Sequence, residues 1–160
     1  MSSWQQLFEL DGKVAVVAGG AGLIGAKLSE VLADAGAHVV IVDQNEELAR
    51  QEAARISQTT KGEVFAECVN IVDQDQVRAA AQNVWRDLGK CDILINAAHY
   101  KGGAFFADLD NYPLDAWREV LDVNLTGTFL MCREFGGRMY RGDGGAIVNI
   151  SSTYGMVSAD

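Results

Sequence analysis

Short apolar runs alternate with longer amphipathic segments along most of the chain. The runs over residues 14–18 and 38–43 are continuous rather than alternating, as expected for buried strands of a parallel sheet, and three further strands are predicted over residues 63–69, 91–96 and 146–150. Between these runs, apolar residues recur at helical spacing and predict helices over 24–35, 46–57, 74–88 and 114–140. The apolar face of each helix is assigned to the core. This alternation predicts an α/β fold: a doubly wound parallel sheet with strand order 3-2-1-4-5 and helices on both faces.

Polar residues and glycines gather at one end of these strands. In a doubly wound sheet, ligands bind outside the carboxyl ends of the strands, where the winding direction reverses. The chain has the following residues at those ends: Gly19 to Gly25, Asp43, Asn70, Asn96 and Ser151–Ser152. We therefore expect one binding site between the first and the fourth strand.

The turn after the first strand is rich in glycine. Its spacing is Gly19-x-x-Gly22-x-x-Gly25, which differs from the common G-x-G-x-x-G. A turn from strand into helix presents free N–H groups and a positive dipole end to an anion, and glycine lets a pyrophosphate approach the backbone. Asp43 closes the second strand, where dinucleotide-binding folds keep the acid that binds a ribose. An ordinary glycine turn is the alternative, but the pairing with Asp43 favours a dinucleotide site.

Asp43 also bears on the choice of cofactor. A 2′-phosphate on the ribose would face its carboxylate, and like charges in contact repel. Residues 20–24 and 44–45 contain no Arg or Lys that would receive such a phosphate. We therefore expect NAD to be preferred over NADP.

Composition narrows the class of protein. We treat residues 1–160 as a single dinucleotide-binding domain, because 160 residues suffice for one core. A net charge of −9 argues against a nucleic-acid partner. We expect no membrane association, since no apolar run reaches spanning length, and no signal peptide, since the N-terminus lacks a basic start and an apolar core. Cys68, Cys91 and Cys132 match no metal spacing, so we predict no metal site and buried, reduced thiols in a cytoplasmic protein.

Several motifs together resemble the short-chain dehydrogenase/reductase family, in its classical type, over nearly all of residues 10–157. The run Ala18-Gly-Gly-Ala-Gly-Leu-Ile-Gly25 is similar to its T-G-x-x-x-G-x-G turn, with Leu23 in place of the middle glycine. Asn96-Ala-Ala-His99 resembles the N-N-A-G motif, with departures at Ala97 and His99. Three further runs resemble the family's adenine-side, helix and serine motifs: Asn70-Ile71, Val123-Asn-Leu-Thr-Gly-Thr128 and Asn149-Ile-Ser-Ser152.

The resemblance implies roles for individual residues. Asn124 would hold a proton-relay water, and Ser152 would hydrogen-bond the substrate oxygen. The implied cofactor-binding residues are Gly19, Ala21, Gly22, Leu23, Ile24, Gly25, Asp43, Asn70, Ile71, Asn96, Ala97 and Ala98. His99, Phe105, Phe106 and Tyr154 stay open, either as substrate contacts or as ordinary loop residues.

One element of the family pattern is absent from the sequence. No Tyr is followed by a Lys four residues later, as the family's acid/base pair Tyr-x-x-x-Lys requires, and Tyr154 is followed by Ser158. We therefore expect this chain to be the N-terminal part of an enzyme, able to bind NAD but hardly able to turn over. The helix over 114–140 would then lack its packing partner, and its apolar face would be partly exposed.

The resulting functional prediction is an NAD-dependent oxidoreductase. It would transfer hydride between nicotinamide and a secondary alcohol or ketone, with a sugar or polyol derivative as a candidate substrate. The resemblance also implies a small-molecule substrate and a homodimer or homotetramer. Two alternatives remain: a sugar-nucleotide epimerase or dehydratase of the extended type, which the Gly19 to Gly25 spacing favours, and a non-catalytic NAD-binding fragment.

Overall fold

Five parallel strands form one sheet in the order β3-β2-β1-β4-β5. The structure is a computed structural model and describes residues 7–152. The strands are β1 (Val14–Ala18), β2 (His38–Asp43), β3 (Val64–Cys68), β4 (Ile93–Asn96) and β5 (Ala146–Asn149). The predicted fold class and strand order are confirmed, with three strands shorter at their ends than the apolar runs suggested.

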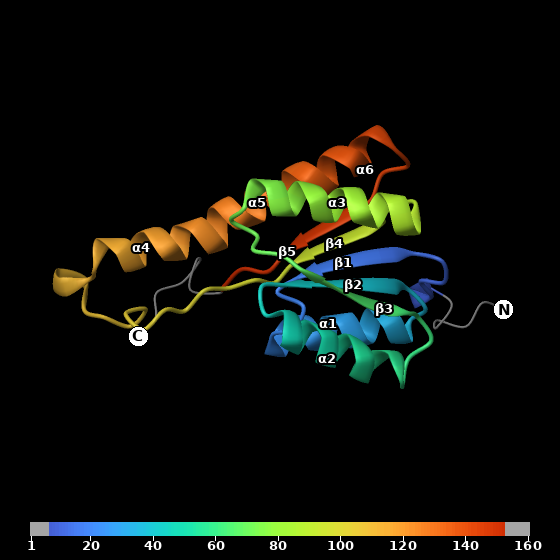
Figure 1. Ribbon diagram of the computed structural model, residues 1–160, viewed down its shortest axis with the longest axis horizontal. Coiled ribbons are helices and arrows are strands. Elements are labelled where there is room, and N and C mark those ends of the chain that lie inside the picture. Colours follow the sequence, from blue (N-terminus) through green and yellow to red (C-terminus); the bar gives the residue numbers. More distant parts are fainter. Residues whose placement is uncertain (1–6, 153–160) are drawn as a thin grey trace.

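Helices cover the two faces of the sheet (Figure 1). One face carries α1 (Leu23–Asp34) and α2 (Glu46–Ser57), and the other carries α3 (Gln74–Leu88) and a long helical segment. That segment comprises α4 (Leu114–Leu121), η3 (Asp122–Gly127), α5 (Thr128–Met131), η4 (Cys132–Gly136) and α6 (Gly137–Arg141), and follows a short turn, η2 (Leu109–Asn111). Its η3 and η4 parts are π-helical, a geometry often found at functional sites.

Side chains and glycines set the helix ends where the sequence predicts them. Asn45 caps α2 by accepting a hydrogen bond from the Leu48 N–H at 3.1 Å. The Asp73 carboxylate caps α3 by accepting from the N–H groups of Asp75 and Gln76, and these bonds lower the pKa of Asp73. Gly36 follows the end of α1 and has a φ of 102°, which favours glycine.

The core lies on both sides of β1, whose residues are all buried. Towards α3, Val16 packs with Leu94, Phe135 and other apolar side chains. Towards α1 and α2, Val17 packs with Ile41 and Ile56. Because β1 is central and covered on both faces, its end is a fixed platform for the turn that follows.

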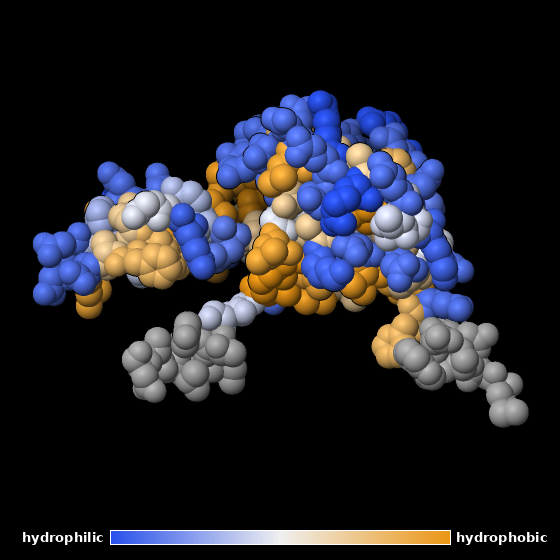
Figure 2. Space-filling view, turned by 90° about the horizontal axis from the view of Figure 1, so that it is seen from below, coloured by the Kyte–Doolittle hydropathy of each residue, from blue (hydrophilic) through white to orange (hydrophobic). Residues whose placement is uncertain are grey.

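Parts of two predicted apolar helix faces are exposed. Ile24 and Val31 of α1 are 58% and 57% exposed, and Trp117 and Leu125 are 54% and 65% exposed. Trp117 lies in α4, which projects beyond the sheet in Figure 1 and has no strand beneath it. Figure 2, viewed from the side of α1 and α2, shows orange apolar surface on both the body and this projecting arm. Helical spacing alone does not distinguish a face on the sheet from a face beyond its edge.

The prediction that all three thiols are buried is wrong for Cys68. This residue ends the edge strand β3 and is exposed, whereas Cys91 is buried and Cys132 is half-buried. Burial raises the pKa of the Cys91 thiol to about 12. Since the thiolate is the nucleophile, burial and this pKa both protect Cys91 from alkylation.

We expect iodoacetamide to modify Cys68 of the folded chain well before Cys91, because only Cys68 is accessible. Peptide mass spectrometry at increasing times would give the order of modification, and the same reaction in denaturant would show that all three thiols can react. Alkylation of Cys91 at the rate of Cys68 under native conditions would contradict the packing of β4 described above.

No helix within residues 7–152 is both long and apolar enough to cross a bilayer. Over the same residues, no group of three or more His, Cys, Asp or Glu side chains is arranged to hold a metal ion.

Candidate functional site

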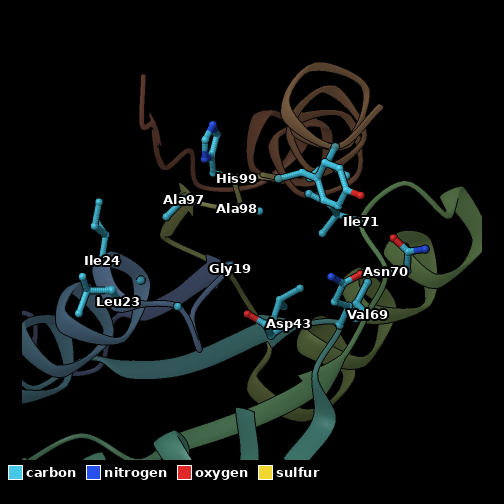
Figure 3. Close-up of a pocket in the computed structure, with 16 residues that line it drawn as sticks. Gly19, Leu23, Ile24, Asp43, Val69, Asn70, Ile71, Ala97, Ala98 and His99 are labelled. Atoms are coloured by element: carbon cyan, nitrogen blue, oxygen red, sulfur yellow. The ribbon is translucent and has the colours of Figure 1, made fainter. Parts of the chain in front are cut away.

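A cleft of about 330 Å³ lies at the carboxyl ends of β1, β2 and β4. Its lining comes from five separate stretches of the chain and is shown in Figure 3. The lining residues are Gly19, Gly22, Leu23, Ile24, Gly25, Val42, Asp43, Gln44, Val69, Asn70, Ile71, Ala97, Ala98, His99, Tyr100 and Val123. The structure therefore places a cleft where the sequence predicted convergence.

The glycine turn lines one side of the cleft and has no room for a Cβ at Gly19 or Gly25. Gly19 has a φ of 72°, and a Cβ there would lie 2.6 Å from the Cα of Ala98. A Cβ on Gly25 would overlap the carbonyl oxygen of Gly19. These close backbone contacts bring β1, β4 and the start of α1 together, so glycine at both positions is a steric requirement.

The start of α1 is open to an anion. Within the described residues, no side chain caps this end, and the first turn contains no acidic residue. The N–H groups of Leu23, Ile24 and Gly25 precede the first intrahelical bond, which runs from the Ala26 N–H to the Gly22 oxygen at 2.8 Å. Free N–H groups and the positive dipole end can hold an anion such as a pyrophosphate.

The Asp43 carboxylate is held at the end of β2 by backbone N–H groups. One oxygen accepts from the Asn45 N–H at 3.0 Å, and the other accepts from the Ala21 N–H at 3.3 Å. In Figure 3, Asp43 lies below Gly19, on the side of Val69 and Asn70. No Lys or Arg is among the residues that line the cleft in the described part of the chain. Such a carboxylate, fixed and without a cation beside it, can accept hydrogen bonds from ribose hydroxyls.

Asn70 and Ile71 form the wall beyond Asp43. The Asn70 N–H donates to the side chain of Gln76 at 2.9 Å, and the Asn70 side-chain oxygen accepts from the Val72 N–H at 3.3 Å. Ile71 is buried, and its end packs against Gly127, where a Cβ would lie 2.6 Å from it. This wall is fixed by its own loop and by η3, and it could border an adenine ring.

Asn96 does not line the cleft, although the sequence placed it in the cofactor set. Its side-chain nitrogen donates to the Asn149 side-chain oxygen at 2.8 Å and lies 3.4 Å from the Cys132 sulfur. Its side-chain oxygen is buried without a partner among the described residues. The amide thus joins β4 to β5 and to η4, behind the cleft. Ala21 also lies behind it, and contributes its N–H to Asp43.

Asn124 lies in η3 and fixes the loop that follows β4. Its side-chain oxygen accepts from the Tyr100 N–H at 2.9 Å, and its carbonyl oxygen accepts from the Thr128 hydroxyl at 3.0 Å. The Tyr100 hydroxyl donates to Glu119 at 2.9 Å, and this bond and the Glu119 charge raise the pKa of Tyr100. Tyr100 and Val123 also line the cleft but were missed in the sequence. Tyr100 belongs to no motif, whereas Val123 begins the motif Val123-Asn-Leu-Thr-Gly-Thr128, which was the available signal.

Ser152 follows β5 and is exposed, and it is not among the residues that line the cleft. Every residue of β5 is also exposed, in contrast to β1. Tyr154 lies outside the described residues. The structure therefore brings together the predicted dinucleotide set except Ala21 and Asn96, and it does not bring Ser152 to the cleft.

Comparison with known proteins gives a consistent picture. A family model described as short chain dehydrogenase matches residues 13–160. The chain is 40% identical to D-threitol dehydrogenase of Mycolicibacterium smegmatis, covering 96% of this chain and 57% of that protein. It is 31% identical to NAD-dependent glycerol dehydrogenase of Listeria innocua, covering 96% of this chain and 58% of the relative.

Solved structures agree with the sequence matches. An NAD⁺-bound xylitol dehydrogenase has a TM-score of 0.88 at 31% identity, covering 93% of this chain and 56% of that one. A metagenomic short-chain oxidoreductase in complex with NADP has a TM-score of 0.85 at 32% identity, covering 94% of this chain and 66% of the other. The chain thus spans little more than half the length of the curated relatives reported above.

Proposed function

The chain belongs to the short-chain dehydrogenase/reductase family, and we propose that it is the cofactor-binding part of an NAD-dependent oxidoreductase acting on a secondary alcohol or ketone. Family membership supports an oxidoreductase that uses a nicotinamide cofactor. The observation that carries the finer proposal is the cleft, in which the start of α1 has no side-chain cap and the described lining around Asp43 contains no Lys or Arg.

Each part of the cleft has a task in this proposal. The first N–H groups of α1 bind the pyrophosphate, and Gly19 and Gly25 let it approach the backbone. Asp43 accepts hydrogen bonds from the ribose hydroxyls and repels a 2′-phosphate. Asn70 and Ile71 border the adenine ring. The bound nicotinamide supplies the hydride acceptor or donor.

The reacting end is incomplete in this chain. By family resemblance, Ser152 hydrogen-bonds the substrate oxygen, and Asn124 holds a water for proton relay. The acid/base pair would come from a segment that follows this sequence in a longer protein. Because general acid/base catalysis contributes roughly 10²–10⁴ in rate, we expect the 160-residue chain to bind NADH but to turn over poorly.

The substrate and the assembly follow from the same family. Relatives named for threitol, glycerol and xylitol support a polyol or a related alcohol as the substrate. We place the longer enzyme in the cytoplasm as a homodimer or homotetramer, without a nucleic-acid or membrane partner. The spacing of Gly19, Gly22 and Gly25 keeps an epimerase of the extended type as a second candidate, in which NAD would be recycled rather than released.

We expect the longer protein to reduce NAD in the presence of D-threitol, xylitol or glycerol, and the 160-residue chain to do so at least roughly 100-fold more slowly. NADH absorbance would follow both reactions, and NADH fluorescence would show that the short chain still binds. Full activity of the short chain, or an absence of net NADH formation with every alcohol tested, would contradict the proposal. The second result would favour the epimerase.

A further inference from the structure

The loop after β4 places an imidazole beside the cleft, on the side away from Asp43. In Figure 3, His99 lies with Ala97 and Ala98 above Gly19, whereas Asp43 and Val69 lie below it. A dinucleotide with its adenosine against Asp43 would therefore extend its nicotinamide end towards His99. The family motif resembled by Asn96 to His99 has glycine at this position, so the imidazole adds a side chain that the motif lacks.

Aromatic rings orient this imidazole. The rings of His99 and Phe105 meet edge to face, with centroids 5.6 Å apart and an interplanar angle of 82°. Phe105 packs on Phe106 in the same way at 5.0 Å. The Lys101 ammonium lies 5.8 Å and 6.0 Å from the centroids of these two phenyl rings. The four side chains form one cluster, which we call the His99 cluster.

The residue next to His99 is anchored at two points. The Tyr100 N–H is bonded to Asn124 of η3, and the Tyr100 hydroxyl is bonded to Glu119 of α4. The loop is therefore tied to the long helical segment immediately after His99. Such anchoring keeps a recognition group near its binding geometry and reduces the entropy lost on binding.

His99 has free capacity for hydrogen bonding. Its side chain is exposed, and within residues 7–152 its interaction is the ring contact, without a hydrogen bond or ion pair. A neutral imidazole carries one donor and one acceptor, as a hydroxyl does. A pair of neighbouring hydroxyls can therefore be bound through either nitrogen.

Among the described lining residues, the end of the cleft near His99 offers no cation for an anionic substrate. The described lining contains no Arg or Lys that would clamp a carboxylate or phosphate, and its carboxylate, Asp43, lies at the other end. Lys101 lies over the phenyl rings rather than in the lining. Resting on the proposed function, we infer that His99 binds a hydroxyl next to the reacting carbon of an uncharged polyol, and that Phe105 holds its ring for this contact.

The test uses the longer enzyme with D-threitol, xylitol, glycerol and lactate as substrates. His99→Leu should raise KM for the best polyol roughly tenfold, with a smaller change in kcat, because one hydrogen bond to substrate is lost. His99→Gln, which keeps a donor and an acceptor, should recover most of that loss. NADH affinity should stay unchanged in both variants. His38→Gln, at the amino end of β2, is the matched control and should leave KM unchanged.

Each other result has a defined meaning. An unchanged KM in His99→Leu would overturn the inference, as would an equal loss of NADH affinity, which would assign His99 to the cofactor. A preference for lactate over every polyol would overturn the uncharged substrate class and point to Lys101. If wild-type enzyme binds NADH but oxidises none of the four alcohols, the proposed function itself fails.

Discussion

Gly25→Ala should abolish NADH binding by this chain and destabilise it by about 2–4 kcal/mol, as overpacking against rigid backbone does. The added Cβ would overlap the carbonyl oxygen of Gly19, and neither group can rotate away, because both belong to the backbone. The start of α1 would have to shift from the end of β1. That shift would also move the N–H groups of Leu23 and Ile24 away from the cleft.

Gly137→Ala is the matched control for this variant. Gly137 begins α6 with helical backbone, and a Cβ there would meet only the Arg141 guanidinium at 3.7 Å. Alanine should be neutral or stabilise the helix by about 0.5–1 kcal/mol. Urea unfolding would give the stability of both variants, and NADH titration would give their affinity for the nucleotide. Wild-type stability and affinity in Gly25→Ala would show that the turn is not packed as described.

Asp43→Asn should remove most of the discrimination between NADH and NADPH. The variant keeps one side-chain oxygen, which can accept from the Asn45 N–H, and loses the acceptor of the longer bond from the Ala21 N–H, so the local change should be small. It loses the charged acceptor for the ribose hydroxyls, which should weaken NADH binding roughly tenfold or more. It also loses the repulsion of a 2′-phosphate, so NADPH binding should improve.

Asp115→Asn, on the projecting α4, removes the same charge far from the cleft and should change neither affinity. Fluorescence titrations with NADH and NADPH at one ionic strength would give the ratio of the two affinities for each variant. An NADH-to-NADPH ratio in Asp43→Asn equal to that of the wild type would exclude Asp43 as the selecting residue. Circular dichroism would show whether Asp43→Asn is folded. An unfolding midpoint equal to that of the wild type would show that any loss of affinity is a loss of binding and not of folding.

Much of the fold was predictable because strand and helix have different hydrophobic periods. The continuous run at Val14–Ala18 became a central buried strand, and the helices over 46–57 and 74–88 begin where expected, after Asn45 and Asp73. The turn at Gly19 to Gly25 and the acid at Asp43 were also predictable, since steric limits and strand-end position determine them. These features depend on local sequence, and one sequence suffices to identify them.

Contacts between distant segments were not predictable in this way. The Asn96 side chain turns to Asn149 of the neighbouring strand, and a residue type does not reveal on which side of a strand end it points. Tyr100 joins Asn124 and Glu119 across the loop and belongs to no motif. Both depend on the register of elements that meet only in the folded chain.

Exposure at the sheet edge has the same origin. The missing packing partner predicted partial exposure of the long helical segment, but periodicity did not show that its α4 part extends past the strands (Figure 1). Cys68 was expected to be buried as a residue at the end of a strand, but β3 lies at the edge of the sheet. The strand order is therefore needed before burial can be assigned to α4 or to Cys68.

The most direct test of the account is a titration of the wild-type 160-residue chain with NADH and with NADPH, followed by nucleotide fluorescence. The cleft geometry predicts binding of both to the same site, with NADH roughly tenfold or more tighter because of Asp43. Equal affinities would contradict the role of Asp43, and no binding of either nucleotide would contradict the dinucleotide site as a whole.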